Sequence, residues 1–205
     1  QIDKNNFSLR NINSADLKDE EALIELVSDA LIKGLVVGWF YGDMEWGPRA
    51  LGHRSILGDP RRKDMKDILN LKIKKRESFR PFAPSILAEH VSDWFEINCE
   101  GQKDVPFMMK VYKFKTDKRN LVPAVCHVDG SGRLQTVTLD VNKRYYKLIK
   151  KFYDKTKIPM ILNTSFNENE PIVRTAEEAL ECFLRTKMDM LVLNDYILLR
   201  SGFEL

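Results

Sequence analysis

Short apolar runs alternate with helix-length amphipathic segments, and this alternation restricts the fold more than any other feature of the chain. The longest apolar runs, such as residues 35–41, have the length of a buried strand and are too short to cross a membrane as a helix. Residues 20–33 and 142–155 repeat apolar side chains at helical spacing, and residues 175–187 begin with a capping box. We therefore predict an α+β (mixed α/β) fold, with a mixed sheet flanked by helices.

Other elements follow from local patterns. Asp59 before Pro60 predicts the start of a helix, because Asp is a good N-cap and Pro is tolerated at the first helical position. The turn-forming sequence at residues 129–132 predicts a hairpin between strands at 122–128 and 133–139. Further strands are predicted at residues 82–87, 107–114, 160–162, 190–193 and 196–200, with Phe107, Met109 and Val111 on the inner face of their strand.

Length and composition fit one soluble globular domain. The first 18 of the 205 residues are polar and predict a lead-in or linker before a domain at 19–205, and the lack of an initial Met suggests a piece of a longer protein. The cysteines Cys99, Cys126 and Cys182 are far apart, which predicts free thiols and a cytoplasmic location. The three histidines are equally scattered, so no metal site is expected in this chain. Because the apolar runs are only strand-length, no membrane partner is expected either.

Positive charge is concentrated in one part of the chain. Residues 47–81 hold six Arg and five Lys against three Asp and one Glu, a balance of +7, while the whole chain carries only +3. The small total charge argues against nucleic acid as a partner, whereas the local excess predicts a cleft for small phosphate-bearing molecules. Guanidinium groups pair with phosphate or carboxylate in a bidentate manner, which supports that prediction.

Two groups of cations in this stretch are candidate ligands. Arg49 and Arg54 lie in a segment with P-loop-like glycine spacing, but His53 stands where Lys should follow Gly52, so a Walker A site is excluded. A turn with surface arginines explains this segment equally well. The second group comprises Lys74, Arg76 and Arg80, held near prolines and phenylalanines, although Arg80 has an alternative as an ion-pair partner of Glu77.

Polar residues elsewhere are weaker candidates. Asn163, Ser165 and Asn167 follow a short apolar strand, where they have the chemistry to hydrogen-bond a ligand or to satisfy their own turn. His127 and Arg133 flank the predicted hairpin turn. No nucleophile motif is present, so chemistry run by cations and amides favours phosphoryl or adenylyl transfer over a covalent mechanism.

Several long motifs resemble one family. They are the string from Met44 to Ile56 (MEWGPRALGHRSI), Lys74 and Arg76 with residues 79–84 (FRPFAP), residues 123–130 (PAVCHVDG), and residues 162–167 (LNTSFN) with the Glu170-Pro171-Ile172-Val173 segment. Together they look like the carboxy-terminal domain of the NodU/CmcH-type O-carbamoyltransferases. The resemblance covers the chain from about residue 35 to its end.

The resemblance implies a YrdC-like fold that binds carbamoyl phosphate and ATP, with Mg²⁺ accompanying the nucleotide, and forms carbamoyl adenylate. The carbamoyl group would then pass to an acceptor hydroxyl in an amino-terminal actin-like domain of the same polypeptide, which holds the family's metal ion and is missing here. The acceptor itself cannot be read from this chain. Two alternatives stay open, a non-catalytic RNA-binding or regulatory module and an enzyme similar to threonylcarbamoyl-adenylate synthases.

The family's site residues carry over by motif position. Lys74 and Arg76 match a Lys-x-Arg anion clamp, and Ser165 with Asn167 matches a Ser-x-Asn element beside the nucleotide. The resemblance thus implies catalytic roles for Lys74, Arg76 and Arg80, and substrate or nucleotide binding by Arg49, Arg54, His127, Arg133, Asn163, Ser165 and Asn167. In one departure, Asn169 stands where glycine is expected, which puts the neighbouring loop contacts in doubt.

Overall fold

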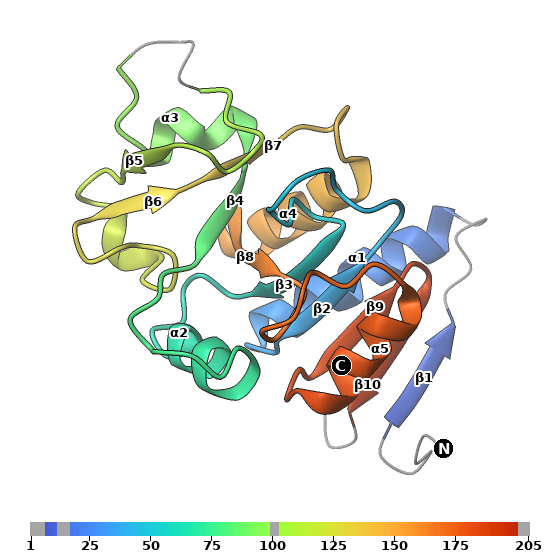
Figure 1. Cartoon of the computed structure of the whole chain (residues 1–205). Helices are drawn as coiled ribbons and strands as arrows, with labels where there is room; N and C mark the ends of the chain where they lie inside the picture. Colours follow the sequence, from blue (N-terminus) through green and yellow to red (C-terminus); the bar gives the residue numbers. More distant parts are fainter. Residues whose placement is uncertain (1–6, 12–16, 99–102, 201–205) are drawn as a thin grey trace.

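The computed structural model describes residues 7–11, 17–98 and 103–200, and in these it forms a single large sheet flanked by helices (Figure 1). The strand order is β1-β10-β9-β2-β3-β8-β4-β7, and a separate pair is formed by β5 (Val111–Lys113) and β6 (Ser131–Arg133). The strands of the large sheet are β1 (Phe7–Asn11), β10 (Tyr196–Arg200), β9 (Met190–Leu193), β2 (Val37–Phe40), β3 (Arg54–Gly58), β8 (Met160–Ser165), β4 (Ala83–Leu87) and β7 (Gln135–Val137).

The large sheet is mixed, as predicted. Strand β2 pairs in parallel with β9 and β4 pairs in parallel with β7, whereas β3 and β8 run antiparallel to each other and to their outer neighbours. The central strands β2, β3 and β4 are buried along their whole length, and β3 and β4 bury the polar residues Arg54, Ser55 and Ser85 as well as apolar ones. The mixed α/β fold class predicted from the sequence is confirmed.

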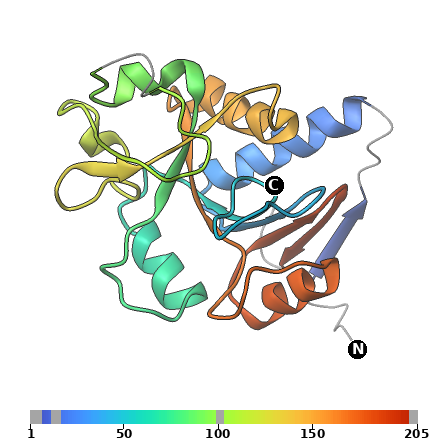
Figure 2. The same ribbon diagram turned by 45° about the horizontal axis from the view of Figure 1, so that its top comes forward.

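Helices cover both faces of the sheet (Figure 2). Helices α1 (Leu17–Ile32) and α4 (Lys143–Thr156) pack together on one face, and α5 (Ala176–Arg185) lies on the other face with the segment α2 (Met65–Asp67) and η2 (Ile68–Ile73). Short helical segments complete the chain at η3 (Ala88–His90), α3 (Val91–Trp94) and η5 (Arg119–Leu121). The helix prediction for residues 142–155 is confirmed, with Asn142 as the N-cap that accepts from Tyr145 N at 3.1 Å.

The capping prediction for α5 holds in part. Thr175 Oγ1 accepts from the backbone N–H of Glu178 at 3.2 Å, as a capping box requires. The Glu178 carboxylate, however, accepts from the N–H of Arg174 and not from that of Thr175. The helix ends at Arg185, two residues before the predicted end.

Around the basic stretch, one element was not predicted and one prediction is wrong. Residues 54–58 form the buried strand β3, which was not predicted because glycines and cations on either side resemble a turn. Asp59 does not begin a helix, since its carboxylate accepts from the backbone and side chain of Arg61. The helix starts at Met65 and continues as a π-helix to Ile73.

The predicted strand at 107–114 is largely wrong. Only Val111–Lys113 are extended, and the Phe107, Met109 and Val111 side chains expected inside are exposed. Met108 is buried instead, and its φ of +55° breaks the alternation. The predicted hairpin between 122–128 and 133–139 is also absent from the described residues, because β6 pairs with β5 and not with residues 122–128.

The first part of the chain contributes to the sheet. Strand β1 lies inside the stretch predicted as a lead-in and pairs antiparallel with β10, and α1 begins at Leu17. Other parts of that stretch, and Cys99, lie outside the described residues. Among the helices that the structure describes, none combines the length and apolar character needed to cross a membrane.

Candidate anion-binding site

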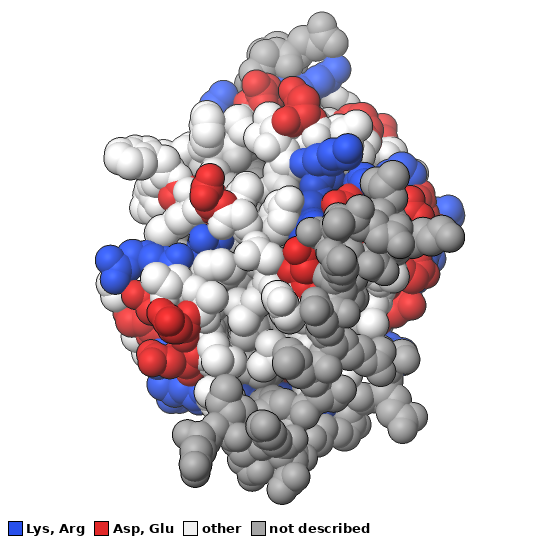
Figure 3. All heavy atoms as spheres, turned by 90° about the vertical axis from the view of Figure 1, so that its right-hand side faces the viewer, with Lys and Arg blue, Asp and Glu red and all other residues white. Residues whose placement is uncertain are grey.

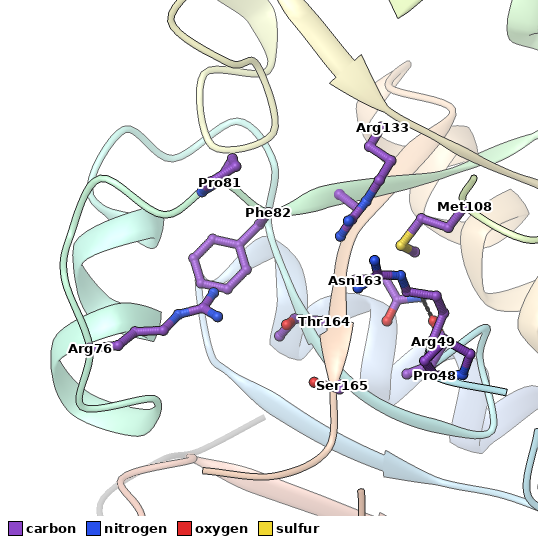
Figure 4. A pocket seen from close by; sticks show the side chains of 12 residues that line it. Pro48, Arg49, Arg76, Pro81, Phe82, Met108, Arg133, Asn163, Thr164 and Ser165 are labelled. Atoms are coloured by element: carbon purple, nitrogen blue, oxygen red, sulfur yellow. Dashed lines mark hydrogen bonds between the residues drawn. The ribbon is translucent and has the colours of Figure 1, made fainter. Parts of the chain in front are cut away.

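A two-part cavity opens where β4, β6 and β8 meet the loop before β3 (Figure 4). The inner compartment encloses about 110 Å³ and the outer one about 370 Å³. Both are lined by Arg49, Arg76, Pro81, Phe82 and Arg133. None of the described residues that line either compartment is Asp or Glu, so the positive charge of this cavity is not neutralised from its own walls.

The loop that carries Arg49 is held by a carboxylate. Glu45 Oε1 accepts from the backbone N–H groups of Leu51 at 2.6 Å and His53 at 2.7 Å. Gly52 is required in this loop, because its φ is +107° and a Cβ atom there would lie 2.3 Å from the Tyr145 ring. The glycines that resemble a P-loop therefore shape the loop around Glu45 and Tyr145.

A buried network of three polar side chains holds the same loop from below. Asn163 Nδ2 donates to the Ala50 carbonyl at 3.0 Å, and Gln135 Nε2 donates to the Leu51 carbonyl at 2.8 Å. Gln135 Oε1 accepts from Ser85 Oγ at 2.6 Å and from Asn163 Nδ2 at 3.1 Å. Strands β7 and β8 thus each supply one side chain that holds the backbone next to Arg49, and Ser85 of β4 connects these two side chains.

The side chains of Arg49 and Arg133 have no hydrogen-bond or ion-pair partner among the described residues. The Nε atom of each is buried and unpaired, while both side chains line the cavity. Burial lowers the pKa of Arg133, and the positive charge of Arg49 lowers it further. Two neighbouring guanidiniums without a counter-charge make a site for an anion.

Three successive cations at the end of η2 point in different directions. Lys74 is almost completely buried, and its Nζ donates to the carbonyls of Ser165 at 2.6 Å and Asn167 at 2.7 Å and to Asn167 Oδ1 at 2.6 Å. Lys75, at a φ of +43°, pairs with Glu168 at 2.7 Å. Arg76 reaches the cavity, with its Nε on Asn70 Oδ1 at 2.7 Å and its guanidinium 5.0 Å from the centre of the Phe82 ring.

Lys74 is therefore brought to the edge of the site but does not line the cavity. Its three short contacts match the three donors of an ammonium group. Burial, with a further contribution from Arg76, lowers the pKa of Lys74 to about 7. The geometry gives Lys74 the role of holding Ser165 and Asn167 in place.

Ser165 and Asn167 are paired with each other as well as with Lys74. Ser165 Oγ donates to Asn167 Oδ1 at 2.9 Å, and Asn167 Nδ2 donates to the Glu170 carbonyl at 2.6 Å. Of the two, only Ser165 lines the inner compartment. Asn169, where the resemblance implies glycine, has no positive φ, so this departure puts no strain on the backbone.

The outer compartment adds Arg80 and His127. Arg80 is exposed and pairs with Glu77 at 3.1 Å, which is the alternative that the sequence left open. His127 Nδ1 lies 3.1 Å from Ser131 Oγ, and burial lowers the pKa of this imidazole. Neither side chain touches the inner compartment.

Arg54 is separated from the other candidates. Its side chain is buried and donates to the carbonyls of Tyr41 at 3.2 Å, Gly42 at 2.9 Å and His53 at 3.0 Å. Its guanidinium also lies 3.5 Å from the centre of the Phe40 ring. Arg54 lines neither compartment, so the geometry gives it a structural role, and its predicted contact with substrate has no support here.

Comparison with known proteins places this arrangement in a family. The family model described as "Carbamoyltransferase C-terminus" matches residues 28–200, which include every residue of the cavity. The chain belongs to this family. The family membership expected from the resemblance to NodU/CmcH-type enzymes is therefore confirmed.

Curated relatives of this chain are much longer than the chain itself. The nodulation protein NolO of Bradyrhizobium diazoefficiens is 44% identical over 89% of this chain and 33% of its own length. The 3'-hydroxymethylcephem-O-carbamoyltransferase of Amycolatopsis lactamdurans is 37% identical over 81% of this chain and 31% of its own length. The chain therefore spans about a third of the length of the curated relatives it matches.

Solved structures with this fold have low sequence identity to this chain. Full-length HypF in its phosphate- and nucleotide-bound form has a TM-score of 0.60 at 21% identity, covering 84% of this chain and 25% of HypF. P. abyssi Sua5 complexed with L-threonine has a TM-score of 0.59 at 13% identity, covering 85% of this chain and 47% of Sua5. The predicted YrdC-like fold is confirmed.

Sequence reasoning missed several residues that build the site. Glu45, Ser85 and Gln135 position the Arg49 loop, and Met108 lines the inner compartment. Glu45 lies within the MEWGPRALGHRSI string, so its motif was noted but not its role. Ser85 and Gln135 are isolated polar residues in short strands, and no spacing in the sequence connects them.

Proposed function

We propose that this domain binds carbamoyl phosphate and ATP and forms carbamoyl adenylate. The observation that carries the proposal is the cavity lined by Arg49, Arg76 and Arg133, in which two guanidiniums lack any partner and no described lining residue is acidic. Such a site fits an anion with several oxygens. Membership of the Carbamoyltransferase C-terminus family supports carbamoyl phosphate as that anion.

The two compartments suggest how two phosphate-bearing ligands would be divided. Carbamoyl phosphate is small enough for the inner compartment of about 110 Å³, where Arg49 and Arg133 would hold its phosphate. ATP would extend into the outer compartment of about 370 Å³, beside Arg80 and His127. HypF, part of which shares the fold, has been crystallised in a phosphate- and nucleotide-bound form, and this supports phosphate-bearing ligands for proteins with such a domain.

The residues that line the cavity also indicate how Mg²⁺ would be bound. No described cavity residue is a carboxylate, so the protein offers Mg²⁺ none of its preferred charged ligands here. Mg²⁺ would therefore be held by the nucleotide phosphates and water. It would neutralise phosphate charge, while the arginines would do the same from the protein side.

In the proposed reaction, the cavity residues bind the ligands and stabilise negative charge electrostatically. Water first cleaves carbamoyl phosphate to carbamate and inorganic phosphate. A carbamate oxygen then attacks the α-phosphorus of ATP, the P–O bond to pyrophosphate breaks, and negative charge develops on the oxygens of the transferred group. Arg49, Arg76 and Arg133 would stabilise that charge in a partly desolvated site. Lys74 would keep Ser165 and Asn167 in place, and Arg80 would contribute less because it is exposed and paired with Glu77.

Transfer of the carbamoyl group to an acceptor hydroxyl is part of the same proposal. It would take place in another part of a longer polypeptide, the expected actin-like domain, because the relatives are about three times the length of this chain. A nucleic-acid role has less support. On the face seen in Figure 3, basic and acidic side chains alternate, and the described residues there form no continuous basic surface.

The experiment is exchange of labelled pyrophosphate into ATP. We expect exchange that requires carbamoyl phosphate and Mg²⁺, and that falls at least about tenfold in Arg133→Ala. The control is Lys150→Ala, which removes an exposed cation that pairs with Asp154 on α4, away from the cavity. Binding of RNA in a gel shift, with no exchange in the wild-type domain, would contradict the proposal.

A further inference from the structure

Three atoms in the walls of the inner compartment are buried and lack a hydrogen-bond partner among the described residues. Two are donors, the Nε atoms of Arg49 and Arg133, and the third is an acceptor, Oδ1 of Asn163. The Asn163 side chain is only 1% exposed. A buried acceptor without a donor costs free energy, so its retention beside a cavity points to a ligand that supplies the donor.

The orientation of the Asn163 amide is fixed by its neighbours. Gln135 donates through Nε2 to the Leu51 carbonyl, which turns Gln135 Oε1 toward Asn163 and Ser85. Asn163 then meets acceptors on one side only, namely the Ala50 carbonyl at 3.0 Å, Ser85 Oγ at 3.0 Å and Gln135 Oε1. Exchanging the oxygen and nitrogen of Asn163 would place oxygen against oxygen, so Oδ1 must be the atom left unpaired.

The cavity therefore offers a ligand many donors and one strong unpaired acceptor. Its arginines suit a phosphate, and an amide oxygen suits an N–H group. Carbamoyl phosphate has both, since its phosphate accepts and its terminal amino group donates. Acetyl phosphate has the same phosphate but carries a methyl group where carbamoyl phosphate has its amino group.

We propose that Asn163 Oδ1 accepts a hydrogen bond from the amino group of the ligand and so selects a carbamoyl group over an acetyl group. Asn163 would be a specificity-determining residue of the site, and the inference rests on the proposed function. Arg49 lies beside Asn163 in Figure 4, and both residues line the inner compartment. The amino group would reach Oδ1 once the Arg49 side chain has turned onto the phosphate.

Calorimetric titration of the domain with carbamoyl phosphate and with acetyl phosphate tests this assignment. In the wild type we expect carbamoyl phosphate to bind about tenfold more tightly, because the methyl group leaves Oδ1 unpaired. In Asn163→Leu we expect the two dissociation constants to become similar. Arg49→Ala is the matched control, since it should weaken both ligands by a similar factor and leave their ratio unchanged.

The outcomes separate the inference from the proposed function. Equal affinity of the wild type for the two ligands would overturn the role of Asn163 and leave the anion site intact. A preference for carbamoyl phosphate that survives in Asn163→Leu would also overturn it. Failure of the wild type to bind either ligand would overturn the proposed function, and the inference with it. If Asn163→Leu does not fold, the wild-type ratio alone decides.

Discussion

Lys74 and Asn167, 93 residues apart in sequence, are joined by two hydrogen bonds from one ammonium group, to Oδ1 at 2.6 Å and to the carbonyl at 2.7 Å. The contact ties the end of η2 to the end of β8. Because burial lowers the pKa of Lys74 to about 7, this tie is linked to pH. In the unfolded chain the same amine has a pKa of about 10.4.

Substitution Lys74→Met should change how stability depends on pH. Between pH 7 and about 10.4 the unfolded chain holds a proton that the folded domain has lost, so this lysine makes the free energy of unfolding rise with pH. We expect the wild type to gain stability relative to Lys74→Met over this window, by up to about 1.4 kcal/mol per pH unit. Below pH 7 the difference should be constant.

Urea unfolding at several pH values from 6 to 10 measures this slope. Lys75→Met is the control, because the neighbouring lysine has a half-exposed side chain, unlike the buried Lys74. We expect the larger departure from the wild-type slope in Lys74→Met. Parallel stability curves for the wild type and Lys74→Met would contradict a lowered pKa at Lys74.

Gly52→Ala should strongly destabilise the domain. Its Cβ atom would lie 2.3 Å from the Tyr145 ring, and the φ of +107° adds backbone strain. We expect a loss of about 2–4 kcal/mol in the free energy of unfolding. Gly47→Ala is a close control, since Gly47 has a φ of +115° but a Cβ atom added there would meet no other atom within 4 Å, so only about 1 kcal/mol should be lost. Equal losses would show that contact with Tyr145 does not matter.

Arg54→Met separates a structural arginine from a ligand-binding one. Arg54 donates to three carbonyls in the β2–β3 connection, and its buried guanidinium packs on the Phe40 ring, so Arg54→Met removes these contacts together. We expect unfolding to become easier by about 2–4 kcal/mol. Arg80→Ala, at an exposed pair, should cost less than about 1 kcal/mol. Thermal unfolding of both variants checks the contrast, and an undiminished melting temperature in Arg54→Met would contradict it.

Sequence patterns predicted the parts of the fold that repeat regularly. The helix at α4 and the strands β2, β4, β9 and β10 follow from apolar periodicity and caps. Strand β3 was missed because its apolar residues lie between cations and glycines. These residues are needed for tertiary contacts, such as the close approach of Gly52 to Tyr145, which the local sequence does not reveal. The 107–114 segment was misassigned because a positive φ at Met108 reverses the side-chain alternation.

The candidate site was predicted in its chemistry more than in its geometry. The +7 stretch supplies Arg49 and Arg76, and the motif beyond the predicted turn supplies Arg133, all of which line one cavity. Local sequence could not tell that Arg54 faces backbone carbonyls while Arg49 does not. It also could not connect Ser85 with Gln135, because their contact depends on β4 pairing with β7 fifty residues away.

The central claim is that the unpaired arginines of the cavity bind carbamoyl phosphate. Calorimetric titration of wild type and Arg133→Ala with carbamoyl phosphate tests it most directly, with the melting temperature of each protein measured alongside. We expect the dissociation constant to rise about 10- to 100-fold in Arg133→Ala. The melting temperature should stay the same or increase, because Arg133 has no partner and is repelled by Arg49. An unchanged dissociation constant in a folded Arg133→Ala domain would contradict the account.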